Sequence, residues 1–164
     1  MKTLVVYYSF EGDTKFIGDA IAKEMEADVL ELTIAKEVKS KDYMKHYLGE
    51  KQVLMKTEPL LKPYDKKPQD YDLIIIGTPV WSGTYAPALR SFFRIEEIKG
   101  KNIAFFYCFT VKAGRVSRRM KKRLRRNDFI GDIGFKDPLK GDKDIALKRV
   151  ERWVAGLKEY LTDK

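Results

Sequence analysis

Short apolar runs alternate with amphipathic stretches along this chain, and the alternation predicts strands and helices in turn. Three runs are brief, β-branched or aromatic, and followed by turn residues, as expected of buried strands: 4–8, 73–76 and 103–107. Two weaker runs are typical of edge strands, because 28–32 alternates apolar and polar residues and 129–135 is broken by Gly131 and Gly134. The pattern therefore predicts five strands.

Apolar residues at helical spacing separate most of these runs. The clearest stripes lie at 17–25, 116–124 and 146–161. Pro87 stands where the first turn of another helix is expected, and residues 40–55 predict an extra helix after the second strand. Strands and helices in alternation predict one doubly wound α/β domain over residues 1–164, with a five-stranded parallel sheet and helices on both faces.

The composition fits a globular, soluble domain, with 44% hydrophobic and 35% charged residues among 164. The one cysteine, Cys108, has no disulfide partner and is expected to be a core thiol, and with one histidine, His46, no metal site is expected. The apolar run 4–8 is too short for a membrane span or a signal peptide. These features predict a cytoplasmic protein without membrane association.

The first predicted strand-to-helix turn, Ser-Phe-Glu-Gly-Asp-Thr-Lys at 9–15, has the features of a phosphate site. A helix N-terminus at the carboxyl edge of such a sheet offers backbone N–H groups to a phosphate. Ser9 and Thr14 can add hydroxyl hydrogen bonds, and Gly12 allows close backbone approach. The motifs GxxxxGK[ST] and GxGxxG are absent, which disfavours a nucleoside triphosphatase. Capping of the helix by Ser9 and Thr14 without any ligand remains an alternative.

Two segments of the chain resemble the flavodoxin superfamily. They are Tyr-Tyr-Ser-Phe-Glu-Gly-Asp-Thr-Lys at 7–15 and Gly-Thr-Pro-Val-Trp-Ser-Gly-Thr-Tyr-Ala-Pro at 77–87, and they match in order, spacing and strand context. The resemblance extends over essentially the whole chain. It implies the strand order 2-1-3-4-5, with flavin mononucleotide (FMN) bound where the order reverses between the first and third strands.

The resemblance implies an FMN-binding flavoprotein that acts in electron transfer. The alternatives are an NAD(P)H-dependent FMN or quinone reductase, and a flavin-free protein of the same fold that binds an anionic partner. In the redox readings the flavin carries the chemistry, so no catalytic acid or base is expected in the protein. A redox partner protein or NAD(P)H would be the partner of the flavin.

The resemblance also implies which residues form the cofactor site. The first loop, 9–14, would hold the phosphate. The second loop, 78–83, would border the isoalloxazine ring, and the third loop, 109–114, would close the pyrimidine end. Trp81 is either the aromatic neighbour of the ring or a packing residue beside the strand end. The implied cofactor-binding residues are Ser9, Phe10, Glu11, Gly12, Asp13 and Thr14; Thr78, Pro79, Val80, Trp81, Ser82 and Gly83; and Phe109, Thr110 and Gly114.

The first loop departs from the family pattern, which usually has Thr and Asn where this chain has Glu11 and Asp13. A carboxylate about 5 Å from a phosphate charge costs roughly 3 kcal/mol at an effective dielectric near 20. Asp13 would therefore weaken phosphate binding, unless it caps the helix and turns away from the ligand. Replacement of Asp13 by Asn is expected to tighten FMN binding.

The net charge of +9 comes from one segment. Residues 112–126 hold nine Lys and Arg residues and no acid, whereas the rest of the chain has 24 basic and 24 acidic residues. Two explanations stay open for the stretch from Arg115 to Arg126: a solvated helix face, or a surface for an anionic partner. That partner would be an acidic redox protein, the phosphates of a nicotinamide dinucleotide or nucleic acid, of which nucleic acid is the least favoured.

Overall fold

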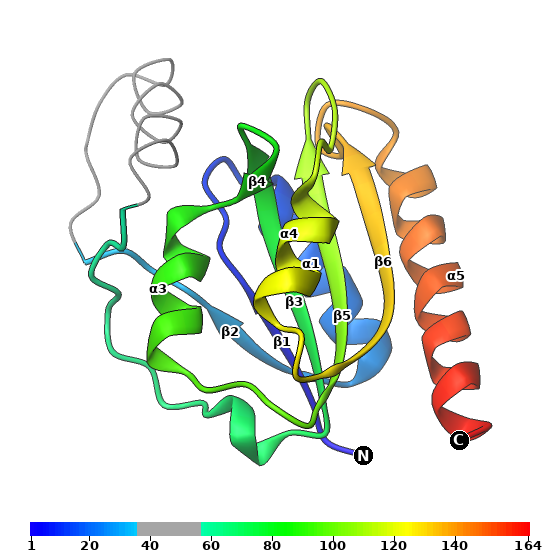
Figure 1. Cartoon of the computed structure of the whole chain (residues 1–164). Helices are drawn as coiled ribbons and strands as arrows, with labels where there is room; N and C mark the ends of the chain where they lie inside the picture. The colour runs from blue at the N-terminus through cyan, green and yellow to red at the C-terminus, as the bar shows by residue number, and fades with distance from the viewer. Residues whose placement is uncertain (36–56) are drawn as a thin grey trace.

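Five parallel strands form the centre of the computed structural model, which describes residues 1–35 and 57–164 (Figure 1). The order across the sheet is β2-β1-β3-β5-β6. This confirms the predicted order, and it places the two weaker strands, β2 and β6, at the edges as expected. The bounds are β1 (Thr3–Tyr7), β2 (Asp28–Glu31), β3 (Leu73–Trp81), β5 (Asn102–Phe109) and β6 (Asp128–Lys136).

A short sixth strand, β4 (Thr84–Tyr85), was not predicted. It runs antiparallel to the end of β3, with Val80 opposite Tyr85 and Trp81 opposite Thr84. Ser82 and Gly83 join the two strands, and both have positive φ, of 50° and 70°. Two positive φ values in a two-residue connection are characteristic of a type I′ hairpin turn. The sheet is therefore five-stranded and parallel, as predicted, with a small hairpin added at one end of β3.

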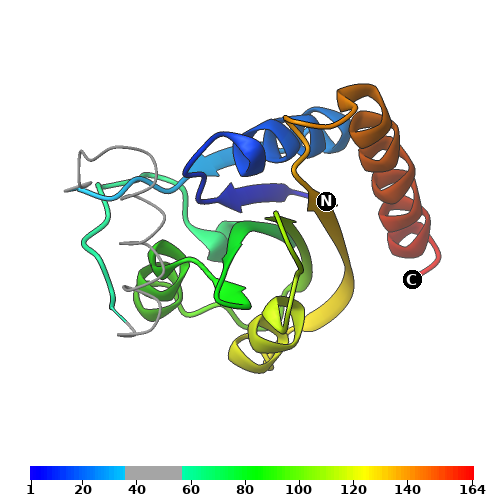
Figure 2. The same ribbon diagram turned by 90° about the horizontal axis from the view of Figure 1, so that it is seen from above.

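The helices cover both faces of the sheet (Figure 2). On one face lie α1 (Asp13–Met25) and α5 (Lys143–Thr162), and on the other lie α3 (Pro87–Ile95) and α4 (Val116–Arg123). Pro87 is the first residue of α3, as its sequence position predicted. A 3₁₀ turn, η1 (Pro68–Asp70), precedes β3. The predicted helix within 40–55 and His46 fall outside the described residues.

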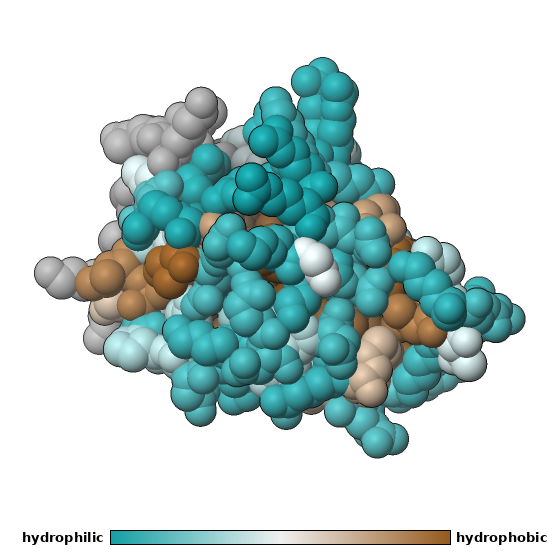
Figure 3. Space-filling view, turned by 60° about the horizontal axis from the view of Figure 1, so that its bottom comes forward, coloured by the Kyte–Doolittle hydropathy of each residue, from teal (hydrophilic) through white to brown (hydrophobic). Residues whose placement is uncertain are grey.

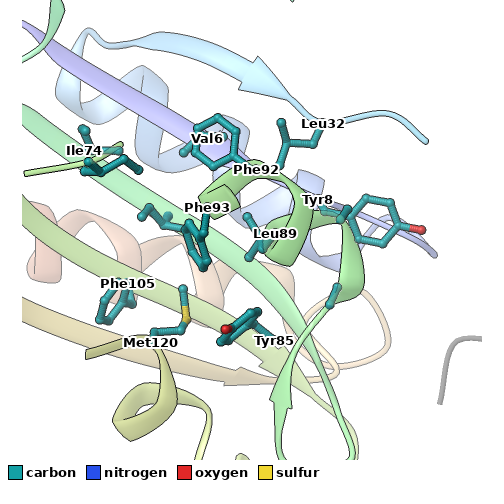
Figure 4. Packing of buried hydrophobic residues seen from close by; sticks show 14 of the residues in the cluster. Val6, Tyr8, Leu32, Ile74, Tyr85, Leu89, Phe92, Phe93, Phe105 and Met120 are labelled. Atoms are coloured by element: carbon teal, nitrogen blue, oxygen red, sulfur yellow. The ribbon is translucent and has the colours of Figure 1, made fainter. Parts of the chain in front are cut away.

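Each face of the sheet has its own apolar core. On the α3–α4 face, Phe92, Phe93 and Phe105 pack with Met120 under the two helices (Figure 4). On the opposite face, α1 and α5 bury their apolar stripes against Phe106 and its neighbours in the sheet. Strands β1 and β3 are buried on both faces, which explains why they appear in the sequence as uninterrupted apolar runs.

One face of the molecule is mostly polar (Figure 3). The side brought forward in Figure 3 is predominantly hydrophilic, and its hydrophobic residues form small separate groups. Among the helices of the described ranges, none combines the length and the apolar character that crossing a membrane requires.

Candidate functional site

A cavity of about 520 Å³ opens at the carboxyl ends of β1, β3 and β5, and we call it the loop cavity. Three loops meet there, because the ends of parallel strands lie at the same edge of a sheet. Most of the residues implied by the resemblance line the loop cavity: Phe10, Glu11, Asp13, Thr14, Pro79, Val80, Trp81, Ser82, Gly83, Phe109 and Thr110. The structure therefore brings the three predicted loops together at one cavity.

The remaining four residues, Ser9, Gly12, Thr78 and Gly114, are not among the lining residues. Ser9 supports the first turn of α1, because its Oγ accepts a hydrogen bond from the backbone N–H of Lys15 at 3.0 Å. Thr78 is fully buried, and its Oγ1 accepts from the N–H of Ala86 at 2.9 Å. These two hydroxyls hold the loops in shape.

Asp13 is not the N-cap of α1, so the capping alternative for this carboxylate does not hold. Gly12, at φ 104°, occupies the N-cap position, and Asp13 is the first helical residue. The Asp13 carboxylate instead accepts a hydrogen bond at Oδ1 from the backbone N–H of Leu139, at 3.0 Å. Asp13 therefore connects the first loop to the chain between β6 and α5.

This connection, residues 137–142, is a component of the site that the sequence did not reveal. A Cβ atom on Gly12 would lie 3.3 Å from Cδ1 of Leu139, so the connection rests directly on the first turn. Asp137 accepts a hydrogen bond from the Thr110 hydroxyl at 2.9 Å, which joins it to the third loop as well. Lys140 lines the loop cavity. The sequence signal that could have located it is its position after the last parallel strand, which ends at the same edge as the others.

The second and third loops touch through two glycines. Gly83 and Gly114 both have positive φ, and a Cβ on Gly114 would lie only 2.7 Å from Cα of Gly83. The backbone N–H of Arg115 donates to the Gly83 carbonyl at 3.2 Å. Glycine is required at position 114 both for its backbone conformation and for this close approach.

Trp81 is packed and also lines the loop cavity. It is 8% exposed, and its ring meets Phe10 edge-to-face with centroids 5.3 Å apart. Tyr8 makes a second edge-to-face contact with it at 6.0 Å. The two readings of Trp81 are therefore compatible, because the packed ring still forms part of the cavity wall.

The charges around the loop cavity are mixed. Glu11 and Asp13 line it together with Lys112 and Lys140, two cations that were not among the predicted site residues. Lys15, which follows the first turn, is instead committed to Asp19 and Glu31, with N–O distances of 3.2 and 3.1 Å. The cations that offset the acidic first loop thus come from the third loop and from the connection before α5.

Cys108 also lines the loop cavity, but it is not an activated nucleophile. Burial, and then the carboxylates of Asp13 and Asp137, raise the pKa of its thiol to about 12. A hydrogen bond with the Thr14 side chain opposes this shift without reversing it. The thiol is uncharged at neutral pH, as expected for a core cysteine.

An open parallel sheet of order β2-β1-β3-β5-β6, which is 2-1-3-4-5 when only the parallel strands are counted, defines a flavodoxin-like fold when a loop cavity lies beyond β1 and β3. The model of the flavodoxin domain family matches residues 39–129, which include the second and third loops. The chain belongs to the flavodoxin domain family. A search of curated proteins found no match.

Several solved structures share this fold at low sequence identity. The flavoprotein of Lactobacillus acidophilus NCFM, solved in complex with FMN, is 22% identical, with a TM-score of 0.71 over 85% of this chain and 96% of its own. A flavodoxin from the domain Archaea is 18% identical, with a TM-score of 0.63 over 99% of both chains. Flavodoxin 2 of Bacillus cereus is 17% identical, with a TM-score of 0.59 over 98% of this chain and 99% of its own.

Proposed function

We propose that this chain binds FMN in the loop cavity and acts as an electron-transfer flavoprotein. The observation that carries the proposal is the convergence of three loops on a cavity of about 520 Å³, at the point where the strand order reverses. This is the place where doubly wound sheets bind their ligands, and the volume lies in the range of small-molecule sites. The similar flavoprotein of Lactobacillus acidophilus NCFM was solved with FMN.

The residues of the loop cavity suit the two ends of FMN. The N-terminus of α1, at Asp13 and Thr14, offers backbone N–H groups and the positive end of the helix dipole to the phosphate. Lys140 and Lys112 supply positive charge in the same cavity. Phe10 and Trp81 provide apolar surface for the isoalloxazine ring, and their mutual packing fixes that surface before any ligand arrives.

In this proposal FMN supplies the electron transfer and the protein sets its position and potential. Lys112 and Lys140 favour negative charge on the reduced flavin, so we expect a less negative potential than in acidic relatives. Replacing both lysines by Gln should lower the potential measured by redox titration, and a rise would contradict this electrostatic role. The proposal includes a cytoplasmic location, which suits a chain whose single cysteine is an unpaired thiol.

The test is titration of the flavin-free protein with FMN, followed by flavin fluorescence. We expect saturable quenching, a yellow complex, and weaker binding by Trp81→Ala. The other tryptophan offers a matched control, because Trp153 packs on the opposite face of the sheet and Trp153→Ala should bind FMN normally. An absence of binding with FMN in large excess would overturn the proposal and favour a flavin-free binding protein.

Electron transfer is tested separately on the complex. The photoreduced protein should pass electrons to an added acceptor, while NADPH alone should leave the bound flavin oxidised. Bleaching of the flavin by NADPH alone would indicate an NAD(P)H-dependent reductase in place of an electron carrier. It would not contradict the proposed FMN site.

A further inference from the structure

A second and larger cavity, of about 780 Å³, lies between α3 and α4, and we call it the helix groove. It begins at Thr84 and Tyr85, directly after the hairpin turn of the second loop, and reaches Arg125 and Arg126 beyond α4. It shares no lining residue with the loop cavity. The helix groove is therefore a separate feature, and an inference about it does not depend on FMN binding.

Cationic side chains from both helices converge on the helix groove. Its lining contains two acidic residues, Glu96 and Glu97. The cations that line it are Arg90, Arg94, Arg119, Lys122, Arg123, Arg125 and Arg126. The basic segment at 112–126 thus supplies one wall and α3 supplies the other, so the positive charge faces a shared concavity in addition to covering one helix.

The two acids already have partners. Glu96 is 8% exposed, and its Oε1 accepts a hydrogen bond from the Tyr64 hydroxyl at 2.7 Å and lies 3.5 Å from Nζ of Lys67. Oε1 of Glu97 lies 3.2 Å from Nζ of Lys99, a residue that does not line the groove. The same oxygen lies 3.7 Å from Nη1 of Arg126, which does line it. These contacts leave most of the positive charge of the groove uncompensated.

Several of the cations lack an acidic partner. Within residues 1–35 and 57–164, no carboxylate lies within 4.0 Å of the charged groups of Arg90, Arg119, Lys122 or Arg125. Like charges are mutually destabilising, so an uncompensated cluster of this kind favours a bound anion.

Two arginines of the helix groove are held in place, one on each wall. Arg123 donates a hydrogen bond from Nη2 to the carbonyl oxygen of Phe93 at 2.7 Å. This bond holds the guanidinium of Arg123 across the groove. The guanidinium of Arg90 lies 5.6 Å from the ring centroid of Tyr85. Its Nε is buried and has no hydrogen-bond partner among the described residues, so this donor is left unsatisfied.

We propose that the helix groove binds the phosphate groups of a small polyanion such as a nucleoside diphosphate or triphosphate. Six of the seven lining cations are arginines, whose planar forks match phosphate oxygens with paired hydrogen bonds. The volume of about 780 Å³ suits a ligand of nucleotide size, and the site is concave.

A small ligand and a macromolecule make different predictions at α4. A ligand inside the groove contacts Arg119 and Lys122, whereas Arg118 and Lys121 of the same helix are not in the groove lining. Duplex DNA or an acidic protein would sense the positive charge of the whole helix. Substitutions of Arg119 with Lys122, compared with substitutions of Arg118 with Lys121, therefore distinguish a small ligand in the groove from duplex DNA or an acidic protein.

The experiment is calorimetric titration of the folded protein with pyrophosphate and with ATP at low salt. Arg119→Gln/Lys122→Gln should weaken binding by about tenfold or more, because two charge-assisted contacts are lost. The matched control Arg118→Gln/Lys121→Gln removes the same charge from the same helix and should weaken binding by less than about twofold, since exposed charges outside the site are screened. Equal losses in the two pairs, or no binding of either probe by the wild type, would overturn the proposal.

A further variant tests the geometry as opposed to the charge. Arg90→Lys keeps the positive charge but removes the fork, and it should also weaken pyrophosphate binding while leaving FMN binding unchanged. Binding of duplex DNA with equal dependence on both pairs would assign α4 to a macromolecule and refute the nucleotide site. A melting temperature recorded for each variant establishes that the protein titrated is folded.

Discussion

The two cavities of this molecule are built in opposite ways. The loop cavity is made of backbone turns that fix one another through glycine contacts and through the hydroxyls of Ser9 and Thr78. The helix groove is made of long side chains projecting from two helices that the fold needs only for their buried faces. The first cavity follows from the topology of the sheet, whereas the second depends on residue choices that the topology leaves free.

The difference is also visible in stability. In α4, like charges at i and i+4, such as Arg118 with Lys122, destabilise the helix by a few tenths of a kcal/mol each. Val116, Met120 and Leu124 anchor the segment against the core. The charges that line the helix groove therefore lower the stability of the fold, whereas the contacts between the loops raise it. Variants in the two regions should differ in their effect on the free energy of unfolding.

The largest effect is expected from Gly114→Ala, which should damage the loop cavity alone. The new Cβ would lie 2.7 Å from the Gly83 backbone, at a residue with φ of 59°. Chemical denaturation should show a loss of about 2 kcal/mol or more, and FMN affinity should fall by at least about tenfold.

Gly100→Ala is the matched control for that variant. Gly100 has a similar φ of 67°, but a Cβ there meets no atom within 4 Å. It should cost about 1 kcal/mol and leave FMN affinity unchanged. If the two variants were equally stable, the contact between the second and third loops would not be a constraint on the site.

The next effect is on charge in the loop cavity. Asp13→Asn keeps an oxygen that can accept from Leu139 but removes a negative charge beside the proposed phosphate. FMN should bind about tenfold more tightly, less than the unscreened repulsion, because Lys112 and Lys140 share the cavity. Fluorescence titration checks this, and an unchanged dissociation constant would mean that the carboxylate is turned away from the phosphate. Binding of pyrophosphate in the helix groove should not change.

A smaller effect separates the internal support of the first loop from its ligand binding. Ser9→Ala removes the acceptor for the N–H of Lys15 and should cost about 1 kcal/mol in denaturation of the flavin-free protein. Ser117→Ala, in the basic helix α4, should cost nothing measurable, because Ala is the better helix former. A neutral Ser9→Ala would show that the first turn does not need this hydrogen bond.

The smallest effect concerns the sheet beneath both cavities. Burial, and then a hydrogen bond to Asp132 at 2.8 Å, raise the pKa of Tyr107 from 10.0 to about 12. Because the folded state holds the proton more tightly, this stability is complete below pH 10 and is lost as the pH rises towards 12. Tyr107→Phe should therefore lose less stability over that interval, measured by denaturation at each pH. An identical alkaline loss in both proteins would contradict the role of this tyrosine.

The sheet was predictable from sequence because its central strands are buried on both faces and must be apolar throughout. The end of β3 was not, since Gly77, Thr78 and Pro79 look like loop residues although β3 continues through them to Trp81. The Ser82–Gly83 pair was the available signal for the hairpin, because Ser-Gly marks turns and Gly accepts positive φ.

The loop cavity was predictable where its residues follow strand ends, and it was missed where distant segments meet. Phe10, Trp81 and Phe109 each lie beside a predicted strand end, and each lines the cavity. Lys140 and Leu139 were missed because, apart from their position after the last strand, their role arises from contacts with residues far away in the chain. The same reason hid the helix groove, since Arg90 and Arg94 look like ordinary solvent-facing residues until α3 is placed beside α4.

The hydrogen bond from Leu139 to Asp13 has a consequence for the order in which the molecule is assembled. It joins residues 126 positions apart, so the first loop obtains its partner only when the chain beyond β6 has left the ribosome. A nascent chain that ends before residue 137 lacks this partner of the Asp13 carboxylate. The loop cavity is thus finished only after β6 has been made, and cofactor capture as proposed would follow the synthesis of all five parallel strands.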